Sequence, residues 1–186
     1  MKRFCVAVSL YLALIAFPLT SSASLPADIT MLSLQGIQYV INWNVGDYTV
    51  YDMEMMFGGE MRKEVTSLED HALWLSQTMD FGFFQAESRI KIDRRTGEIL
   101  EFWVNGEKQE IPETDVSLVK QEEDHITVPA GEFDVIKVTI KDNKTGKLSY
   151  IWINPVEVPM EGMVQMQGET ELGEMVLKLR EFGTGS

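Results

Sequence analysis

The chain has 186 residues, and its 16 basic and 29 acidic residues give a formal net charge of −13. An acidic chain of this kind is repelled by nucleic acid and by anionic membrane surfaces, so nucleic-acid binding is excluded as a function class. The acidic residues are scattered along the chain rather than gathered into a tail, which is typical of a solvated surface.

Residues 1–23 have the pattern of a secretory signal peptide. The basic pair Lys2-Arg3 precedes an apolar run over residues 4–19, and Ser21-Ser22-Ala23 offers the small residues needed for cleavage before Ser24. The run is shorter than the roughly 20 residues of a stable membrane span, although a retained anchor is the alternative. We therefore expect a periplasmic or extracellular protein with no membrane insertion after cleavage, in which residues 24–186 form one domain.

Cys5 is the only cysteine, and it lies inside the predicted signal peptide. The mature chain is therefore expected to contain no disulfide, no thiolate metal site, no cysteine nucleophile and no lipid-modified N-terminal cysteine. Its hydrophobic core alone has to hold it together, and a domain of this length suffices because it buries roughly 70% of its unfolded surface.

The chain from Tyr48 to Val104 reads as strands joined by tight turns. Apolar and polar residues alternate over 48–57, 61–66 and 86–93, and the run from His71 to Met79 is apolar enough for a central strand. We expect Gly58-Gly59 to close the first hairpin through a primed turn, and Asn105-Gly106 is the strongest hairpin signal in the sequence.

The second half continues the pattern after a polar stretch, 107–124, that could hold a short helix. Strands are predicted at 126–128, 133–141, 148–153, 163–167 and 175–182, with Pro129-Ala130-Gly131 as a compact turn. No helix of 10–15 residues separates any two strands, so parallel βαβ units are excluded. We predict a mainly β fold: one strongly curved antiparallel sheet of about ten strands, open or half closed into a barrel, with one or two short covering helices.

Two stretches carry a resemblance to a known family. The first is Trp43-Asn44-Val45-Gly46-Asp47-Tyr48; the second begins at Val128-Pro129-Ala130-Gly131-Glu132-Phe133 and continues through Trp152-Ile153 and Val158-Pro159. The pattern resembles poorly characterised exported bacterial proteins of the LolA and LolB lipoprotein-carrier superfamily. The resemblance implies an unclosed barrel whose concave side, covered by a helix or loops, holds acyl chains; residues 27–36 and 113–121 are the candidate cover.

No arrangement of side chains defines a reaction or a cofactor site. His71 and His125 are the only histidines and are far apart in sequence, and no serine elbow, phosphate loop or dinucleotide fingerprint is present. We expect no catalytic residue, cofactor or metal, and hence no enzyme. A cavity in which either histidine met two carboxylates would revive the alternative of an enzyme.

Methionine is the one unusual component, with ten residues after the predicted signal peptide. Exported methionine clusters can bind Cu(I). However, Met163 and Met166 are an odd number of residues apart and are expected on opposite faces of a strand. Core packing and a deformable apolar lining are the competing interpretations.

The preferred functional hypothesis is a soluble periplasmic carrier or chaperone that holds an apolar small molecule or acyl chain on the concave face. Apolar burial at about 25 cal/mol per Å² would supply the affinity. The alternative is an envelope structural protein with a packed core, which uses its rim or an edge to bind a protein partner. The candidate ligand-binding residues are the apolar members of four predicted strands: Tyr51, Met53, Met55, Phe57, Ile90, Ile92, Ile136, Val138, Ile140, Met175, Leu177 and Leu179.

Overall fold

The computed structural model describes residues 41–112, 115–170 and 173–185, and these form a single sheet of eleven strands. In chain order the strands are β1 (Tyr48–Glu54), β2 (Gly59–Glu69), β3 (Ala72–Asp80), β4 (Gln85–Asp93), β5 (Ile99–Val104), β6 (Glu107–Gln109), β7 (Val116–Val128), β8 (Gly131–Asp142), β9 (Leu148–Ile153), β10 (Met163–Thr170) and β11 (Gly173–Gly183). The predicted signal peptide and the predicted covering helix at 27–36 lie outside the described residues.

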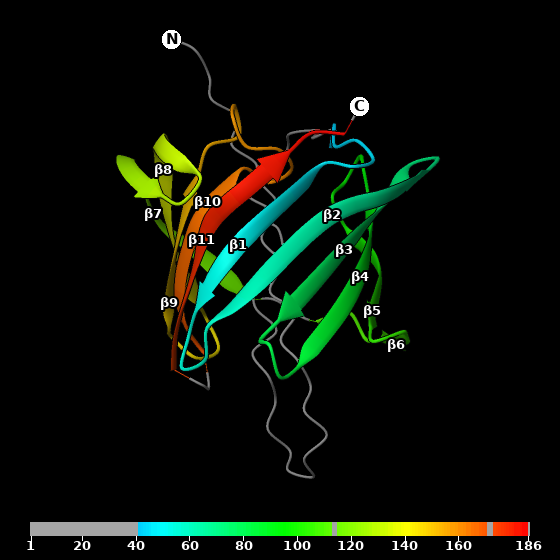
Figure 1. The fold of residues 1–186 in the computed structure, drawn as a ribbon, viewed down its shortest axis with the longest axis horizontal. Helices are drawn as coiled ribbons and strands as arrows, with labels where there is room; N and C mark the ends of the chain where they lie inside the picture. The colour runs from blue at the N-terminus through cyan, green and yellow to red at the C-terminus, as the bar shows by residue number, and fades with distance from the viewer. Residues whose placement is uncertain (1–40, 113–114, 171–172, 186) are drawn as a thin grey trace.

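Every pair of neighbouring strands is antiparallel, and the order across the sheet is β6-β5-β4-β3-β2-β1-β11-β10-β9-β8-β7. All neighbours except β1 and β11 are also consecutive in sequence, so the sheet is a meander in which the last strand closes against the first. Figure 1 shows the sheet strongly bent, with β7 and β6 at opposite sides of the molecule and β1 and β2 between them. The sheet does not close into a barrel, which confirms the predicted fold class.

Alternation along the strands separates an inner face from an outer face. In β4 the inner residues Ala86, Ser88, Ile90 and Ile92 are buried, whereas Glu87 and Arg89 between them are exposed. Successive side chains of a strand point to opposite faces, so a period-two sequence buries one face as soon as the sheet curves. We call the face that carries these buried side chains the inner face.

The polar stretch 107–124 differs from its prediction. Its described residues form the short strand β6 and most of β7 rather than a helix, and no helix occurs among the residues described. Residues 116–125 of β7 are half-buried or exposed, because β7 is an edge strand with only β8 beside it. An edge strand can carry polar residues on both faces, and such a pattern has no period-two signal.

Of the two predicted primed hairpin turns, the one at Asn105-Gly106 is present and the one at Gly58-Gly59 is not. Asn105 and Gly106 both have positive φ, as a primed two-residue turn requires. Gly58 and Gly59 do not, because the loop between β1 and β2 spans four residues, Met55 to Gly58. Gly59 is required for a different reason: a Cβ there would approach the carbonyl oxygen of Asp80 to 2.8 Å.

The tip of the β7–β8 hairpin reaches past β9 and β10 to β11. The Ala130 N–H donates to the Leu179 carbonyl at 3.0 Å. Leu179 is the residue after Lys178, which forms the outermost β10–β11 pair with Gln165, so β10 does not pair with Leu179. An irregularity in the β1–β11 register means that Arg180, immediately after Leu179, lies opposite no residue of β1 in the strand pairing. The predicted Pro-Ala-Gly turn therefore does more than reverse the chain, since it joins the second half of the sheet back onto its middle.

This turn depends on Gly131, whose φ of +141° is open almost only to glycine. We expect Gly131→Ala to lower the free energy of unfolding by about 1–3 kcal/mol in urea denaturation. Gly58→Ala is the matched control, because Gly58 has an ordinary φ and open space around the added Cβ. It should be neutral or slightly stabilising. If the two substitutions lowered the free energy of unfolding equally, the positive φ at residue 131 would not require glycine.

Candidate functional site

A row of polar side chains crosses the inner face at right angles to the strands. Thr49 of β1 pairs with Lys63 of β2, Lys63 pairs with Gln77 of β3, and Gln77 pairs with Ser88 of β4. All four are buried, and Thr49, Lys63 and Gln77 have no exposed surface. Side chains directly opposite one another on antiparallel strands lie about 5 Å apart at Cβ, so the four form one continuous polar row.

This polar row separates two apolar clusters. On β2 it lies between Met61 and Val65, and on β3 between Met79 and Leu75; in each strand the first residue belongs to one cluster and the second to the other. The larger cluster spreads over β1 to β3 and β7 to β11, and the smaller one packs Ile41 and Trp43 against β2 to β4. The carrier hypothesis assumed a uniformly apolar inner face. The polar row shows that the inner face is not uniformly apolar.

The loop of residues 154–162 between β9 and β10 presents a carboxylate to this row. Glu161 is 3% exposed and forms a buried ion pair with the ammonium group of Lys63. Met160 packs in the smaller cluster and Met163 in the larger, so the loop crosses the boundary between the clusters at the same place as the polar row.

Hydrogen bonds and close backbone contacts support the loop conformation that presents Glu161. Asn154 donates to the Asp134 carbonyl at 3.1 Å and accepts from the backbone of Val156 and Glu157, each at 3.0 Å. At Gly162 a Cβ would approach the backbone of Pro155 to 2.7 Å. Met160 has a φ of +58°, a conformation that costs a non-glycine residue about 1 kcal/mol or more and persists only where the surroundings impose it.

Tyr51 of β1 is hydrogen-bonded to the first residue of β10, directly after this loop. Its hydroxyl donates to the Met163 carbonyl at 3.1 Å, and its ring centroid lies 5.9 Å from the ammonium nitrogen of Lys63. Burial raises the pKa of Tyr51 well above its usual value, the negative charge of Glu161 adds to the rise, and the neighbouring Thr49 hydroxyl opposes it. Tyr51 is therefore a neutral hydrogen-bond donor throughout the ordinary pH range.

Several atoms of this region are buried and have no hydrogen-bond partner among the described residues. They are both side-chain polar atoms of Gln77, the Ser88 hydroxyl, the second carboxylate oxygen of Glu161 and, by hydrogen-bond geometry, the Thr49 hydroxyl. Leaving one buried polar atom unpaired costs about 1–3 kcal/mol. Most buried polar groups in proteins are paired, so a cluster of unpaired ones is a feature that requires an explanation.

Most of the predicted ligand-binding residues lie on the inner face, next to one another across the strands. Met53 pairs with Leu177 and Tyr51 pairs with Leu179, whereas Ile90 and Ile92 lie beyond the polar row in the smaller cluster. The nine buried members are Tyr51, Met53, Ile90, Ile92, Val138, Ile140, Met175, Leu177 and Leu179. Met55 and Ile136 are half-buried against the larger cluster, and Phe57 is 53% exposed in the loop after β1.

The expected separation of Met163 and Met166 is wrong. The β9–β10 register skips Val164, so Met163 pairs with Ile153 and Met166 with Ile151, and both methionines are buried in the larger cluster. A bulge adds one residue to a strand and reverses the parity of everything after it. Six methionines belong to this cluster: Met53, Met61, Met79, Met163, Met166 and Met175.

Sequence reasoning missed the polar row, although a signal for part of it was present. Lys63 falls in phase with Met61 and Val65, and Gln77 in phase with Leu75 and Met79. A charged residue at a core position predicts a buried partner. Nothing in the sequence identified Glu161 as that partner, because the two lie 98 residues apart.

The two histidines lie outside this polar row. His71 is exposed, and His125, also exposed, contacts Asp134 at 2.8 Å. Within residues 41–112, 115–170 and 173–185, no group of three histidines and carboxylates could hold a metal ion. The same residues include no helix long and apolar enough to cross a membrane.

Comparison with known proteins places the chain by fold. No family model and no curated protein matches it. A solved structure of a hypothetical protein from Chlamydia trachomatis is similar, with 12% identity, a TM-score of 0.52, and coverage of 78% of this chain and 91% of that one. A Bacteroides fragilis protein, described as exported and as having a YmcC-like fold, aligns over 80% of this chain and 100% of its own, with 10% identity and a TM-score of 0.44. The first likeness shows the fold alone.

Breaking the buried ion pair is the direct test of its role in the site. We expect Glu161→Gln to lower the free energy of unfolding by about 3–5 kcal/mol, because it leaves the Lys63 charge buried without a counter-charge. The double variant Lys63→Met, Glu161→Gln should recover much of that loss in the same urea titration, since the uncompensated charge is gone. A single variant as stable as the wild type would contradict a buried pair.

Proposed function

We propose that the protein is a non-catalytic carrier that binds a lipid or another apolar group on the inner face of its open sheet. The observation that supports this proposal best is the composition of the larger cluster. Its wall consists mostly of methionines and aliphatic residues, contributed mainly by β1 to β3 and β7 to β11. Methionine is flexible and polarizable, so a wall rich in it adapts to acyl chains of different shape.

The resemblance to the lipoprotein carriers points in the same direction, because those proteins use the concave side of an unclosed barrel for acyl chains. The predicted export signal would bring the protein to the periplasm, where an acyl chain in transit needs cover from water. Burial of apolar surface at about 25 cal/mol per Å² is sufficient for binding, so no reaction has to be assumed.

A charge placed at the rim of the apolar wall tests the proposal. Met55 is half-buried against the larger cluster just beyond β1, whereas its neighbour Met56 is 75% exposed. We expect Met55→Glu to weaken binding of a pyrene-labelled fatty alcohol by about tenfold or more, because a carboxylate cannot be buried against the chain without a large desolvation cost. Fluorescence titration measures the affinity.

Met56→Glu is the matched control, since it introduces the same charge one residue away on the solvent side. It should bind the probe as the wild type does, and both variants should give the wild-type circular dichroism spectrum. Absence of probe binding by the wild-type protein, together with lipid-free mass spectra of its organic extract, would contradict the carrier function.

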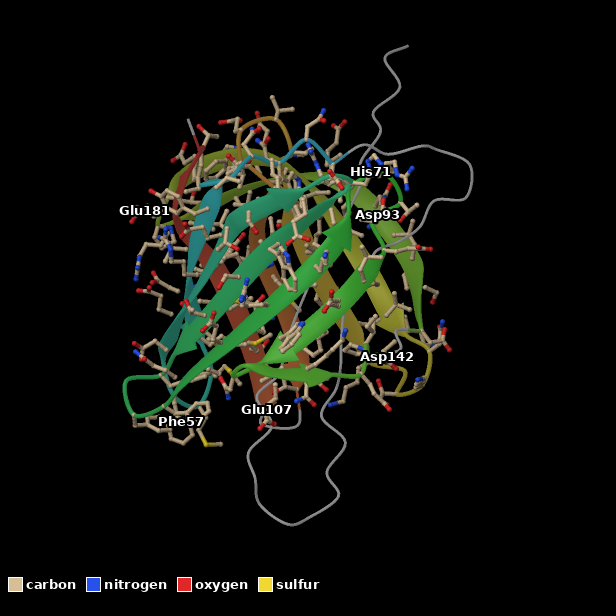
Figure 2. All side chains as sticks on the ribbon, turned by 90° about the vertical axis from the view of Figure 1, so that its right-hand side faces the viewer. Phe57, His71, Asp93, Glu107, Asp142 and Glu181 are labelled. Carbon is tan, nitrogen blue, oxygen red and sulfur yellow. The ribbon has the colours of Figure 1, made fainter. Side chains whose placement is uncertain are left out.

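A second candidate, an envelope interaction protein, is favoured by one surface feature. Phe57 and Phe83, from the β1–β2 and β3–β4 loops, pack edge to face at 5.5 Å between ring centroids. They remain 53% and 68% exposed, and Met56 beside them is 75% exposed. Figure 2 shows Phe57 at the end of the molecule opposite His71 and Asp93. Exposed apolar groups of this kind are typical of contact sites.

A further inference from the structure

The unpaired atoms of the polar row have a definite hydrogen-bonding character. The second oxygen of Glu161 and the Gln77 carbonyl oxygen only accept hydrogen bonds, the Gln77 amide nitrogen only donates, and the Ser88 hydroxyl does either. Gln77 has no exposed surface and Ser88 is 4% exposed, and none of these atoms has a hydrogen-bond partner in the described part of the chain. A group that satisfied them would have to supply at least one donor and one acceptor.

The charges of the site are already balanced. Lys63 is the only cation of the row, and Glu161 neutralises it through the buried ion pair. An added carboxylate or phosphate would lie beside the free oxygen of Glu161 as a second buried negative charge, which is strongly unfavourable without a new cation. A buried ammonium would lie near Lys63 and be disfavoured in the same way. The site therefore selects an uncharged group.

The row is also correctly placed for the polar end of a chain-like ligand. It borders the methionine-rich cluster directly, because Met61 and Met79 are the next inner residues after Lys63 and Gln77 on their strands. A ligand whose hydrocarbon lies on the larger cluster would bring its polar end to this row without crossing exposed surface.

We propose that Gln77, Ser88 and the free oxygen of Glu161 form a head-group subsite for an uncharged group that both donates and accepts hydrogen bonds, such as the hydroxyls of a monoacylglycerol or a primary fatty amide. This inference rests on the proposed carrier function and names the class of its ligand. It excludes fatty acids and simple alkyl esters as preferred ligands, because a fatty acid carries a charge and an alkyl ester has no hydrogen-bond donor.

The test compares ligands that share one acyl chain. Monooleoylglycerol, oleamide, methyl oleate and oleate are used to displace the pyrene-labelled alcohol from the full-length protein. The wild type should bind the first two at least about tenfold more tightly than the last two, which is the effect of one or more hydrogen bonds to buried groups. Gln77→Leu should lose that preference while keeping its affinity for methyl oleate.

Gln121→Leu is the matched control, because it makes the same chemical change on the exposed edge strand β7. It should keep the wild-type preference. Gln77→Leu should also unfold at the same or a higher urea concentration than the wild type, because it removes buried unpaired atoms. A marked loss of stability would assign Gln77 a structural role and overturn the subsite.

The possible outcomes separate the two proposals. Equal affinity of the wild type for methyl oleate and monooleoylglycerol, or a Gln77→Leu variant that keeps the preference, overturns the head-group subsite and leaves the carrier function standing. Tightest binding of oleate overturns the requirement for an uncharged head. If the wild type binds none of the four ligands, the carrier function fails and the subsite fails with it.

Discussion

The buried ion pair between Lys63 and Glu161 is the constraint on which the rest of this structure depends. It joins the middle of the sheet to the loop between β9 and β10, two parts of the chain that no strand pairing connects directly. Each charge alone would carry a desolvation penalty of several kcal/mol, so the loop has to place its carboxylate on the ammonium group. The tight approach at Gly162, the unusual φ of Met160 and the Tyr51 hydroxyl bonded to Met163 all serve this placement.

A polar row through the interior costs stability that a purely apolar core would keep. Replacing buried ion pairs by apolar residues is often neutral or stabilising in other proteins, so the pair itself is weak evidence of a stabilising role. The unpaired atoms of Gln77 and Ser88 add to the cost. A chain whose only cysteine lies in its predicted signal peptide has no disulfide to offset such a cost. This cost is the physical argument behind the proposed head-group subsite.

The open sheet has two edges, and each is kept from pairing with other chains in a different way. The β6 edge is only three residues long, and all three residues are exposed. The β7 edge is long but charged, and its hairpin tip turns inward to bond β11. Short and charged edges are ways in which natural sheets avoid aggregation. The docked tip also gives the meander a contact between strands that are not neighbours, so the curvature of the sheet is fixed without full closure.

The sequence by itself determined the antiparallel architecture, the turns at Asn105-Gly106 and Pro129-Ala130-Gly131, and, for most strands, which residues share a face, because period-two alternation and turn chemistry are local properties. It did not determine which face is the inner one. It did not reveal that residues 107–124 form an edge strand, since such a strand needs no apolar face. Nor could it show that a bulge brings Met163 and Met166 to one side, because one extra residue reverses parity without leaving a mark in composition. Only the tertiary structure decided that Glu161 meets Lys63 beside Gln77 and Ser88, since partners distant in sequence are chosen by the curvature of the sheet.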